Sequence, residues 1–378
     1  MRARPSAGIC VLIACALVSA VLGSVHAFSI FLVPLETALD VSRTRVSFTY
    51  SLALVFLTAT VLLGPKIYGR YAPHHLFLGV GILGGLGALI AGVSTSVFGV
   101  WLGYGLLFGV ANGLGYGFGL QYAARANPMY PGVAMGIVTA AYAFGAAVAP
   151  ILFVRLLDMG GFTAAMLALA VSIIAASLVA ALLVKAVGCT FSDATRRARV
   201  PLPKALIIRL WFAYGMGVAA GLMAIGHAAG IASAAGVTPW LAPAVIAVCN
   251  LCGSLIAGHQ ADHIAPNRVL PILAVISVSG LIMLLVLPTA TLIGLALVGF
   301  AYGGTIAAYP AIIAKRFPGD AGPRAYGRVF TAWGFAGLCA PALAGLLFDF
   351  YGRYGTALWL AAGLAVIAAI LALIPLEN

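Results

Sequence analysis

Two stretches of the sequence, MGIVTAAYAFGAAVAP at 135–150 and YGRVFTAWGFAGLCAP at 326–341, align without a gap at an offset of 191 residues. Both end in Ala-Pro, and the same register continues to Asp158 in the first stretch and Asp349 in the second. Chance similarity between Ala- and Gly-rich helices does not readily match a proline and an aspartate at one offset. The alignment therefore predicts two repeated halves with corresponding apolar helices.

The composition places the chain in a membrane. Of its 378 residues, 63% are hydrophobic and only 7% are charged, and the mean hydropathy is +1.14. Soluble domains carry about 25% charged residues. These values exclude a soluble enzyme, a nucleic-acid-binding protein and a disordered chain. The apolar runs are long and continuous rather than alternating, which favours helices over a β-barrel. We expect an all-α integral membrane protein in contact with the lipid bilayer.

About twelve apolar runs approach the roughly 20 residues that a helix needs to cross a bilayer. They cover residues 7–33, 46–64, 76–94, 97–122, 131–154, 163–185, 204–234, 240–258, 269–287, 289–313, 325–348 and 355–375. The sequence thus predicts six helices in each repeated half.

A polar break with four basic residues and two prolines separates the sixth run from the seventh. We expect an N-terminal six-helix bundle at 1–190, a cytoplasmic linker at 191–203 and a C-terminal six-helix bundle at 204–378.

The net charge of +12 needs no acidic partner. If the N-terminus is cytoplasmic, 16 of the 20 Lys and Arg residues fall on the cytoplasmic side of the twelve predicted helices. Basic residues concentrate in the cytoplasmic loops of membrane proteins. We therefore expect a multi-pass protein of the cell inner membrane, with both termini cytoplasmic and no nucleic-acid partner. A monomer is the expected state.

Six plus six helices in parallel repeats is the layout of major facilitator superfamily transporters. The loop between the predicted helices 8 and 9 resembles a signature of that superfamily, since it runs from Gly258 to Asp262 and His263 with Arg268 following. The glycine allows close helix packing, and the carboxylate can cap a helix N-terminus or pair with a cation. The resemblance implies a conformational latch formed by Gly258, Asp262, Arg324 and Arg328.

The N-terminal copy of this signature is degenerate. Gly64 is present, but Tyr68 stands where the aspartate is expected. We therefore predict an asymmetric latch that is complete only in the C-terminal half.

Within the superfamily, the stretch 25–35 and the entry to helix 5 at 127–136 resemble the CcoA-like branch, which includes bacterial copper importers and riboflavin importers. A more distant resemblance is to the monocarboxylate and oxalate/formate branch. These resemblances imply a secondary active or facilitative transporter that works by alternating access, with no enzymatic activity and no cofactor. The sequence carries no His-Glu-x-x-His motif and no buried pair of carboxylates that would support an enzyme.

Charge patterning restricts the substrate. All eight acidic residues lie outside the centres of the predicted spans, and no Lys or Arg lies at mid-depth. An organic anion would need a fixed cation, and Trp333 stands near the position where oxalate-type relatives carry a lysine. His26 and His227 are the titratable groups well inside spans, and they fall in a second, weaker echo between helices 1 and 7. A histidine there can bind a substrate or carry a coupling proton.

A largely neutral, aromatic solute is the interpretation that remains, and riboflavin uptake is the specific prediction. A flat ring needs stacking partners and a few polar contacts. The alternatives are copper import, through Met223 and His227, and transport of a monocarboxylate- or oxalate-type anion. The candidate substrate-binding residues are His26, Asn112, Tyr142, His227, Asn250 and Trp333. We expect His26, Tyr142, His227 and Trp333 to face a cavity between the two halves.

Overall fold

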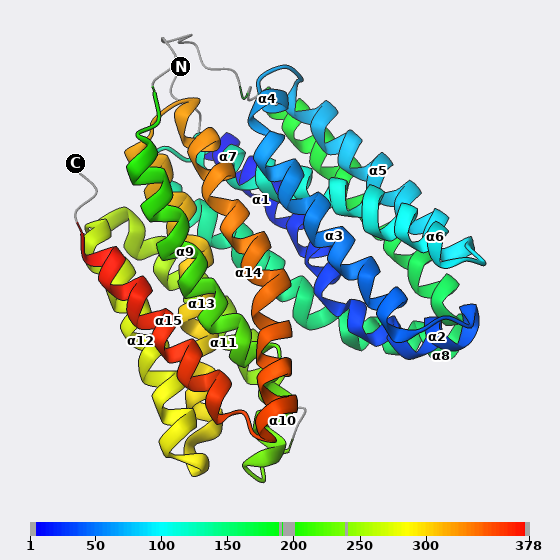
Figure 1. The fold of residues 1–378 in the computed structure, drawn as a ribbon. Coiled ribbons are helices and arrows are strands. Elements are labelled where there is room, and N and C mark those ends of the chain that lie inside the picture. Colours follow the sequence, from blue (N-terminus) through cyan, green and yellow to red (C-terminus); the bar gives the residue numbers. More distant parts are fainter. Residues whose placement is uncertain (1–4, 189–190, 192–200, 239–240, 375–378) are drawn as a thin grey trace. The chain divides into compact units, whose positions relative to one another are not determined.

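The computed structural model describes residues 5–188, 191, 201–238 and 241–374. These residues form helices joined by short loops, and the described part of the chain contains no strand (Figure 1). The first half contains α1 (Pro5–Leu22), η1 (Gly23–Phe31), α2 (Leu32–Leu39), α3 (Arg43–Leu63), α4 (Pro65–Tyr68), α5 (Pro73–Val93), α6 (Val97–Val100), η2 (Trp101–Phe108), α7 (Gly109–Ala126) and α8 (Pro131–Val187). The second half contains α9 (Lys204–Ile225), α10 (Ala228–Ala234), α11 (Leu241–His263), α12 (Pro266–Val286), η3 (Pro288–Ala290), α13 (Thr291–Arg316), α14 (Ala321–Tyr351) and α15 (Gly355–Leu373).

Eleven helical segments of the described chain are long and apolar enough to cross a membrane. One of them, α8, has 57 residues. At about 1.5 Å per residue it would be about 85 Å long, far more than the roughly 30 Å of a hydrocarbon core. Its backbone leaves the helical region at Gly160 and Gly161, and Gly161 has a φ of 67°. Counted as two spans, α8 brings the total to twelve, which confirms the predicted all-α membrane fold.

Contacts divide the chain into two compact units. The first comprises residues 1–129 and 141–196, and the second comprises 130–140 and 197–378. The first turns of α8 therefore belong with the second unit, because α8 approaches α11 closely there. A Cβ atom on Gly136 would lie 2.7 Å from the carbonyl oxygen of Ser254. Most of the predicted 191–203 linker lies outside the described residues.

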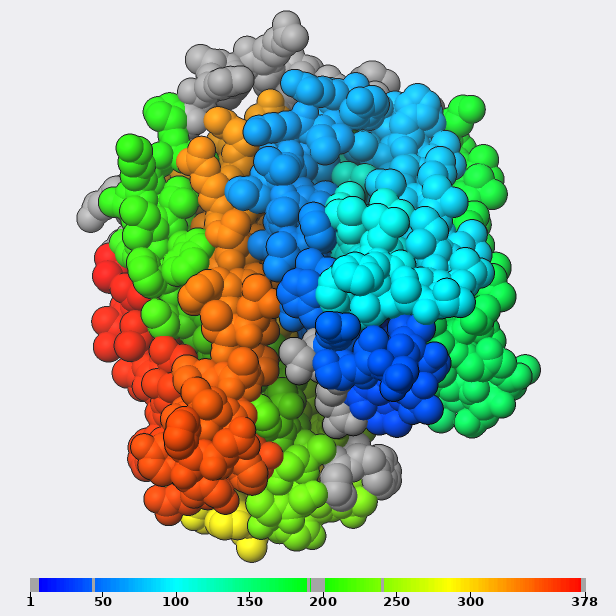
Figure 2. Space-filling view, turned by 45° about the vertical axis from the view of Figure 1, so that its right-hand side comes forward, coloured from blue at the N-terminus to red at the C-terminus, as the bar shows by residue number. Residues whose placement is uncertain are grey.

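Small residues bring helices together within each unit. In the first unit, a Cβ on Gly109 would lie 2.8 Å from the carbonyl oxygen of Ala53, so the glycine lets α7 pack directly on α3. In the second unit, Gly253 of α11 meets the backbone of Phe300 in α13 in the same way. Helices α9 and α14 also lie side by side in this unit (Figure 2). Large apolar side chains remain exposed on many helices, as a lipid-facing surface requires.

Three spans are less regular than the sequence predicts. The first continues to Leu39 and contains nine residues of 3₁₀-helix in η1, although such runs rarely exceed three or four residues. The fourth begins with one turn of α-helix in α6 and continues as eight residues of π-helix in η2. The predicted seventh span, 204–234, is broken at Gly226 and His227 into α9 and α10. At this break Gly226 lies against Pro341, and the His227 ring binds the backbone of the same proline.

Candidate functional site

Three of the six predicted substrate residues meet in the first unit. His26 Nδ1 lies 2.8 Å from the Tyr50 hydroxyl, within hydrogen-bond distance. The His26 ring also makes an edge contact with Tyr142, with ring centroids 5.6 Å apart. His26 is exposed, whereas Tyr50 and Tyr142 are half-buried. We call His26, Tyr50, Asn112 and Tyr142 the His26 cluster.

Asn112 is the buried member of the cluster and fixes the position of Tyr142 through hydrogen bonds. The Tyr142 hydroxyl donates a hydrogen bond of 2.9 Å to Asn112 Oδ1, and Asn112 Nδ2 donates one of 2.7 Å to the carbonyl oxygen of Leu22. The Asn112 side chain is fully buried, and its hydrogen bonds tie α7 to both α1 and α8. Buried amides are normally satisfied in this way. Asn112 therefore positions the Tyr142 ring and does not itself offer surface to a solute.

The two irregular helices meet beside this cluster. His26 lies in η1, and Tyr104 of η2 donates a long hydrogen bond of 3.5 Å to the carbonyl oxygen of Val25. Stretches of 3₁₀- and π-helix often mark hinges and functional sites. The irregular backbone therefore coincides with the polar centre of the first unit.

Trp333 makes a related arrangement in the second unit. Its Nε1 donates a 3.0 Å hydrogen bond to the Tyr302 hydroxyl, and its ring stacks on Phe330 at 5.1 Å between centroids. Tyr142 and Trp333 occupy matched positions in the repeat. Each forms a hydrogen bond with a side chain of the fourth span of its own half, Asn112 in α7 and Tyr302 in α13. The indole is only 6% exposed, so the half-buried Tyr302 offers more surface to a solute than Trp333 does.

The other two predicted residues have separate partners. His227 Nε2 lies 2.9 Å from the carbonyl oxygen of Pro341, and the His227 ring lies 5.5 Å from that of Tyr354. Asn250 Oδ1 accepts a hydrogen bond of 3.4 Å from the Ser254 hydroxyl. No hydrogen bond of His227 or Asn250 within the described chain joins either residue to Trp333.

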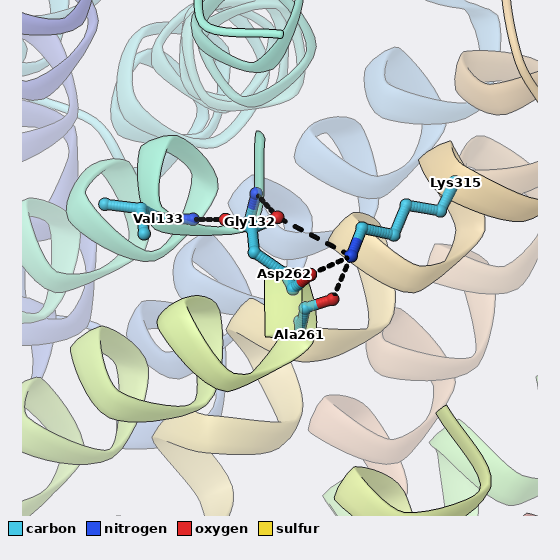
Figure 3. Close-up of polar contacts among 5 residues, drawn as sticks. All are labelled: Gly132, Val133, Ala261, Asp262 and Lys315. Carbon is cyan, nitrogen blue, oxygen red and sulfur yellow. Dashed lines mark hydrogen bonds and ion pairs between the residues drawn. The ribbon is translucent and has the colours of Figure 1, made fainter. Parts of the chain in front are cut away.

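A second polar site surrounds Asp262 at the end of α11 (Figure 3). Its two carboxylate oxygens accept hydrogen bonds of 2.8 Å from the backbone N–H groups of Gly132 and Val133, in the first turn of α8. The Asp262 side chain is only 3% exposed. A carboxylate at this position satisfies unpaired N–H groups and faces the positive end of the helix dipole. Asp262 is thus an N-terminal cap for α8, one of the two roles that the signature predicts.

The cation at this site differs from the prediction. Lys315 Nζ lies 3.8 Å from Asp262 Oδ1 and donates hydrogen bonds to the carbonyl oxygens of Ala261 and Asp262. The predicted partners, Arg324 and Arg328, do not form this ion pair. Arg324 instead donates from Nε to the carbonyl oxygen of Asp320 on its own helix, and the Arg328 side chain is exposed. The sequence does indicate a basic residue here, because the last turn of α13 carries Lys315 and Arg316.

The corresponding region of the first unit contains aromatic rings instead. Tyr68 is 1% exposed and packs against Phe118 and Phe191, with centroids 5.4 and 5.6 Å away. The Arg125 guanidinium lies 3.9 Å from the centre of the Phe191 ring and donates a 2.9 Å hydrogen bond to the Phe191 carbonyl. The sequence does not predict the role of Phe191, because nothing near it in the chain indicates a buried aromatic residue.

The family model of the Major Facilitator Superfamily matches residues 205–378. The chain is 27% identical over 334 residues to the uncharacterized MFS-type transporter YhjX of Escherichia coli (strain K12), covering 84% of this chain and 83% of the relative. It is 28% identical over 295 residues to MFS-type transporter 1 of Ophiocordyceps sp. (strain BCC 1869), covering 72% of this chain and 63% of that one.

Solved structures share the fold at low sequence identity. The xylose symporter XylE superposes with a TM-score of 0.71 at 13% identity, covering 97% of this chain and 95% of that chain. The transporter FucP gives 0.68 at 18%, covering 97% and 98%, and human MFSD10, an organic anion transporter, gives 0.72 at 14%, covering 98% and 100%. The family model thus matches the second half of the chain, and the solved structures share the fold of the whole chain. The CcoA-like branch stays a prediction.

Proposed function

We propose that the chain is a major facilitator superfamily transporter, and that it moves a small, uncharged solute that carries a flat ring and hydrogen-bonding groups. Riboflavin is the solute that we would test first. The observation that carries the proposal is the His26 cluster, which presents two half-buried phenol rings and an exposed imidazole. Aromatic rings with a few placed polar groups are typical of sites for such ligands.

The charge of the surrounding sequence favours a neutral solute. Residues 5–35, 71–124 and 126–154 contain no Asp, Glu, Lys or Arg, and they supply three of the four members of the cluster. Placing a carboxylate in a low-dielectric site without a fixed cation costs several kcal/mol. An oxalate or lactate carrier would need such a cation beside the cluster, and an organic cation would need a carboxylate.

Riboflavin fits these groups as a class of molecule. Its ring system offers faces for stacking on Tyr50 and Tyr142, and its hydroxyl and amide groups offer partners for the exposed His26 ring. The resemblance of residues 25–35 to a branch that includes riboflavin importers adds to this argument. His26 is also the residue of the cluster that could bind a coupling proton.

Binding to purified protein in nanodiscs tests the proposal. Riboflavin fluorescence should be quenched on binding, and proteoliposomes should accumulate the vitamin. Loss of one stacking partner in Tyr142→Ala should weaken binding by about 5- to 150-fold, which corresponds to about 1–3 kcal/mol. Tyr142→Phe keeps the ring but loses the bond to Asn112, so its effect should be smaller. Trp359→Ala, which removes a ring that is 60% exposed on α15, should bind normally.

Three outcomes would contradict the proposal. Riboflavin could fail to bind, Tyr142→Ala could bind as tightly as the wild type, or oxalate and lactate could compete with transport. Competition by the carboxylates would move the function to the organic anion alternative. Rescue of copper-starved cells that depends on Met223 and His227 would move it to copper import, although Met223 is only 1% exposed in this structure.

The cellular setting is part of the same proposal. We place the protein in the bacterial inner membrane as a monomer, with both termini cytoplasmic, because that orientation puts 16 of 20 basic residues inside. Reporter fusions at each terminus test the orientation. A reporter active on the periplasmic side at either terminus would overturn it.

A further inference from the structure

Two histidines lie together at the end of α11, outside the His26 cluster. His259 and His263 are four residues apart, so they share one face of the helix. Both side chains are exposed, and their ring centroids are 4.5 Å apart. Zinc–imidazole bonds are about 2.0–2.1 Å long. Small side-chain rotations would place one nitrogen of each ring at this distance from a shared ion.

We infer that His259 and His263 form a two-imidazole binding site for a divalent transition-metal ion such as Zn²⁺, Ni²⁺ or Cu²⁺. Paired histidines at i and i+4 on a helix are the arrangement used in helical zinc sites. Imidazole suits these metals, whereas Mg²⁺ and Ca²⁺ prefer oxygen ligands. The described residues bring no three His, Cys, Asp or Glu side chains together, so water completes the coordination. Such an open site binds its metal reversibly.

The local charges favour a cation at this end of the helix. The C-terminal turn of α11 carries the negative end of the helix dipole, which attracts positive charge. Lys315 is the nearby cation, but the Asp262 carboxylate lies 3.8 Å from its ammonium group and offsets that charge. The other described ring beside the pair is the phenol of Tyr130, whose centroid is 5.9 Å from that of His263.

A second histidine pair in the chain provides an internal control. His74 and His75 have centroids only 4.1 Å apart, but they are consecutive and lie in the first turn of α5. Consecutive helical residues point in different directions, and a helix N-terminus disfavours a cation. The charge of Lys185 also acts on His74. The two rings are thus about as close as those of His259 and His263, but their orientation and the positive charge around them do not suit a bound metal cation.

Metal at this site would act on the Asp262 cap. A chelate between His259 and His263 holds the last turn of α11 in helical form, and this turn carries the carboxylate that caps α8. Whatever strengthens the cap should therefore tighten metal binding, and metal binding should strengthen the cap to the same extent. The site does not depend on the identity of the transported solute.

The experiment uses full-length protein without a histidine tag, titrated calorimetrically with Ni²⁺ or Zn²⁺. We expect one ion per chain, a higher unfolding temperature with metal, and slower amide exchange at the end of α11. His259→Gln combined with His263→Gln should abolish all three effects, while His74→Gln combined with His75→Gln should retain them. With Cu²⁺, the electron paramagnetic resonance spectrum should show two nitrogen ligands, and one in either single variant.

Clear results would overturn the inference. No saturable binding, binding that survives in the His259/His263 double variant, or binding lost only in the His74/His75 variant would each do so. The unfolding temperature without metal should match the wild type in both double variants, which shows that a lost effect is not a folding defect. Asp262→Asn provides the coupling test, since unchanged metal affinity in that variant would overturn the proposed link to the cap.

Discussion

Two regions occupy equivalent places in the repeat and are stabilised by different forces. In the second unit, Asp262 forms a polar contact in which its carboxylate caps α8 and faces Lys315. In the first unit, Gly64 is followed by Tyr68, and the contact is aromatic, with Phe191 packed against Tyr68. A buried aromatic side chain can substitute for a charged one at the same point of a repeat, provided that its partners change with it.

The difference bears on how readily each contact can open. Water can replace the partners of Asp262, because N–H groups and a carboxylate are both well hydrated when released. Opening the contact of Tyr68 with Phe118 and Phe191 exposes apolar rings, for which water offers no replacement. We therefore expect the Asp262 region to exchange between closed and open states as a latch, and the Tyr68 region to act as a fixed anchor.

The largest effect should come from removing the anchor. Tyr68→Ala deletes a ring that is 1% exposed and should lower the free energy of unfolding by about 3–5 kcal/mol. Tyr68→Phe should be nearly neutral, because the Tyr68 hydroxyl is buried without a hydrogen-bond partner. Thermal or denaturant unfolding in detergent measures both variants. Equal stability of Tyr68→Ala and the wild type would show that the aromatic contact does not anchor this unit.

A smaller effect on stability, but a larger one on transport, is expected at Asp262. Asp262→Asn keeps one acceptor for α8 but loses the second charge-assisted bond and the ion pair, at about 1.5–3 kcal/mol. Transport should slow, and the pattern of cysteine labelling by membrane-impermeant reagents should change. Asp349→Asn, at an exposed site, is the matched control. Wild-type transport and labelling in Asp262→Asn would show that the Asp262 contact does not act as a latch.

The smallest effects on stability are expected for Lys315 and Arg125, and they should differ in their dependence on salt. Lys315 is 37% exposed, so Lys315→Met should cost only about 0.5–1 kcal/mol. High salt should shrink this cost, because salt screens an exposed ion pair. Arg125→Met removes a cation–π contact worth about 0.5–2 kcal/mol from a half-buried site, and its cost should persist in high salt. Unfolding at low and high ionic strength makes the measurement, and equal salt dependence of the two variants would argue against different forces.

The sequence predicts the features that depend on composition and local pattern. Low charge and long apolar runs lead to the membrane fold, and the repeat identifies Tyr142 and Trp333 as equivalent positions. The Gly258–Asp262 signature locates the cap, but it cannot say which basic residue faces it. That choice depends on where the C-terminal end of α13 lies, which only tertiary packing decides. The burial of Phe191 is non-local for the same reason.

The 3₁₀-helix η1 and the break before α10 could not be predicted from the sequence, for a different reason. Residues 23–31 continue the apolar run of the first span with only one strong helix former, Ala27, and nothing in their pattern distinguishes a 3₁₀-helix from an α-helix. The choice depends on contacts such as the close approach of Gly23 to the backbone of Tyr142 in α8. The break before α10 likewise depends on Pro341, which is more than a hundred residues away in the chain.

The nine residues of η1 also constitute a reserve of length. A 3₁₀-helix rises about 2.0 Å per residue and an α-helix about 1.5 Å, so η1 spans about 18 Å where α-helix would span about 13.5 Å. Conversion of the segment to α-helix would shorten the first span by about 4–5 Å. Because the number of residues per turn changes from about 3.0 to 3.6, its two ends would also turn by about 180° relative to each other. A change of helix type alone would thus both draw α2 toward α1 and swing the His26 ring around the helix axis.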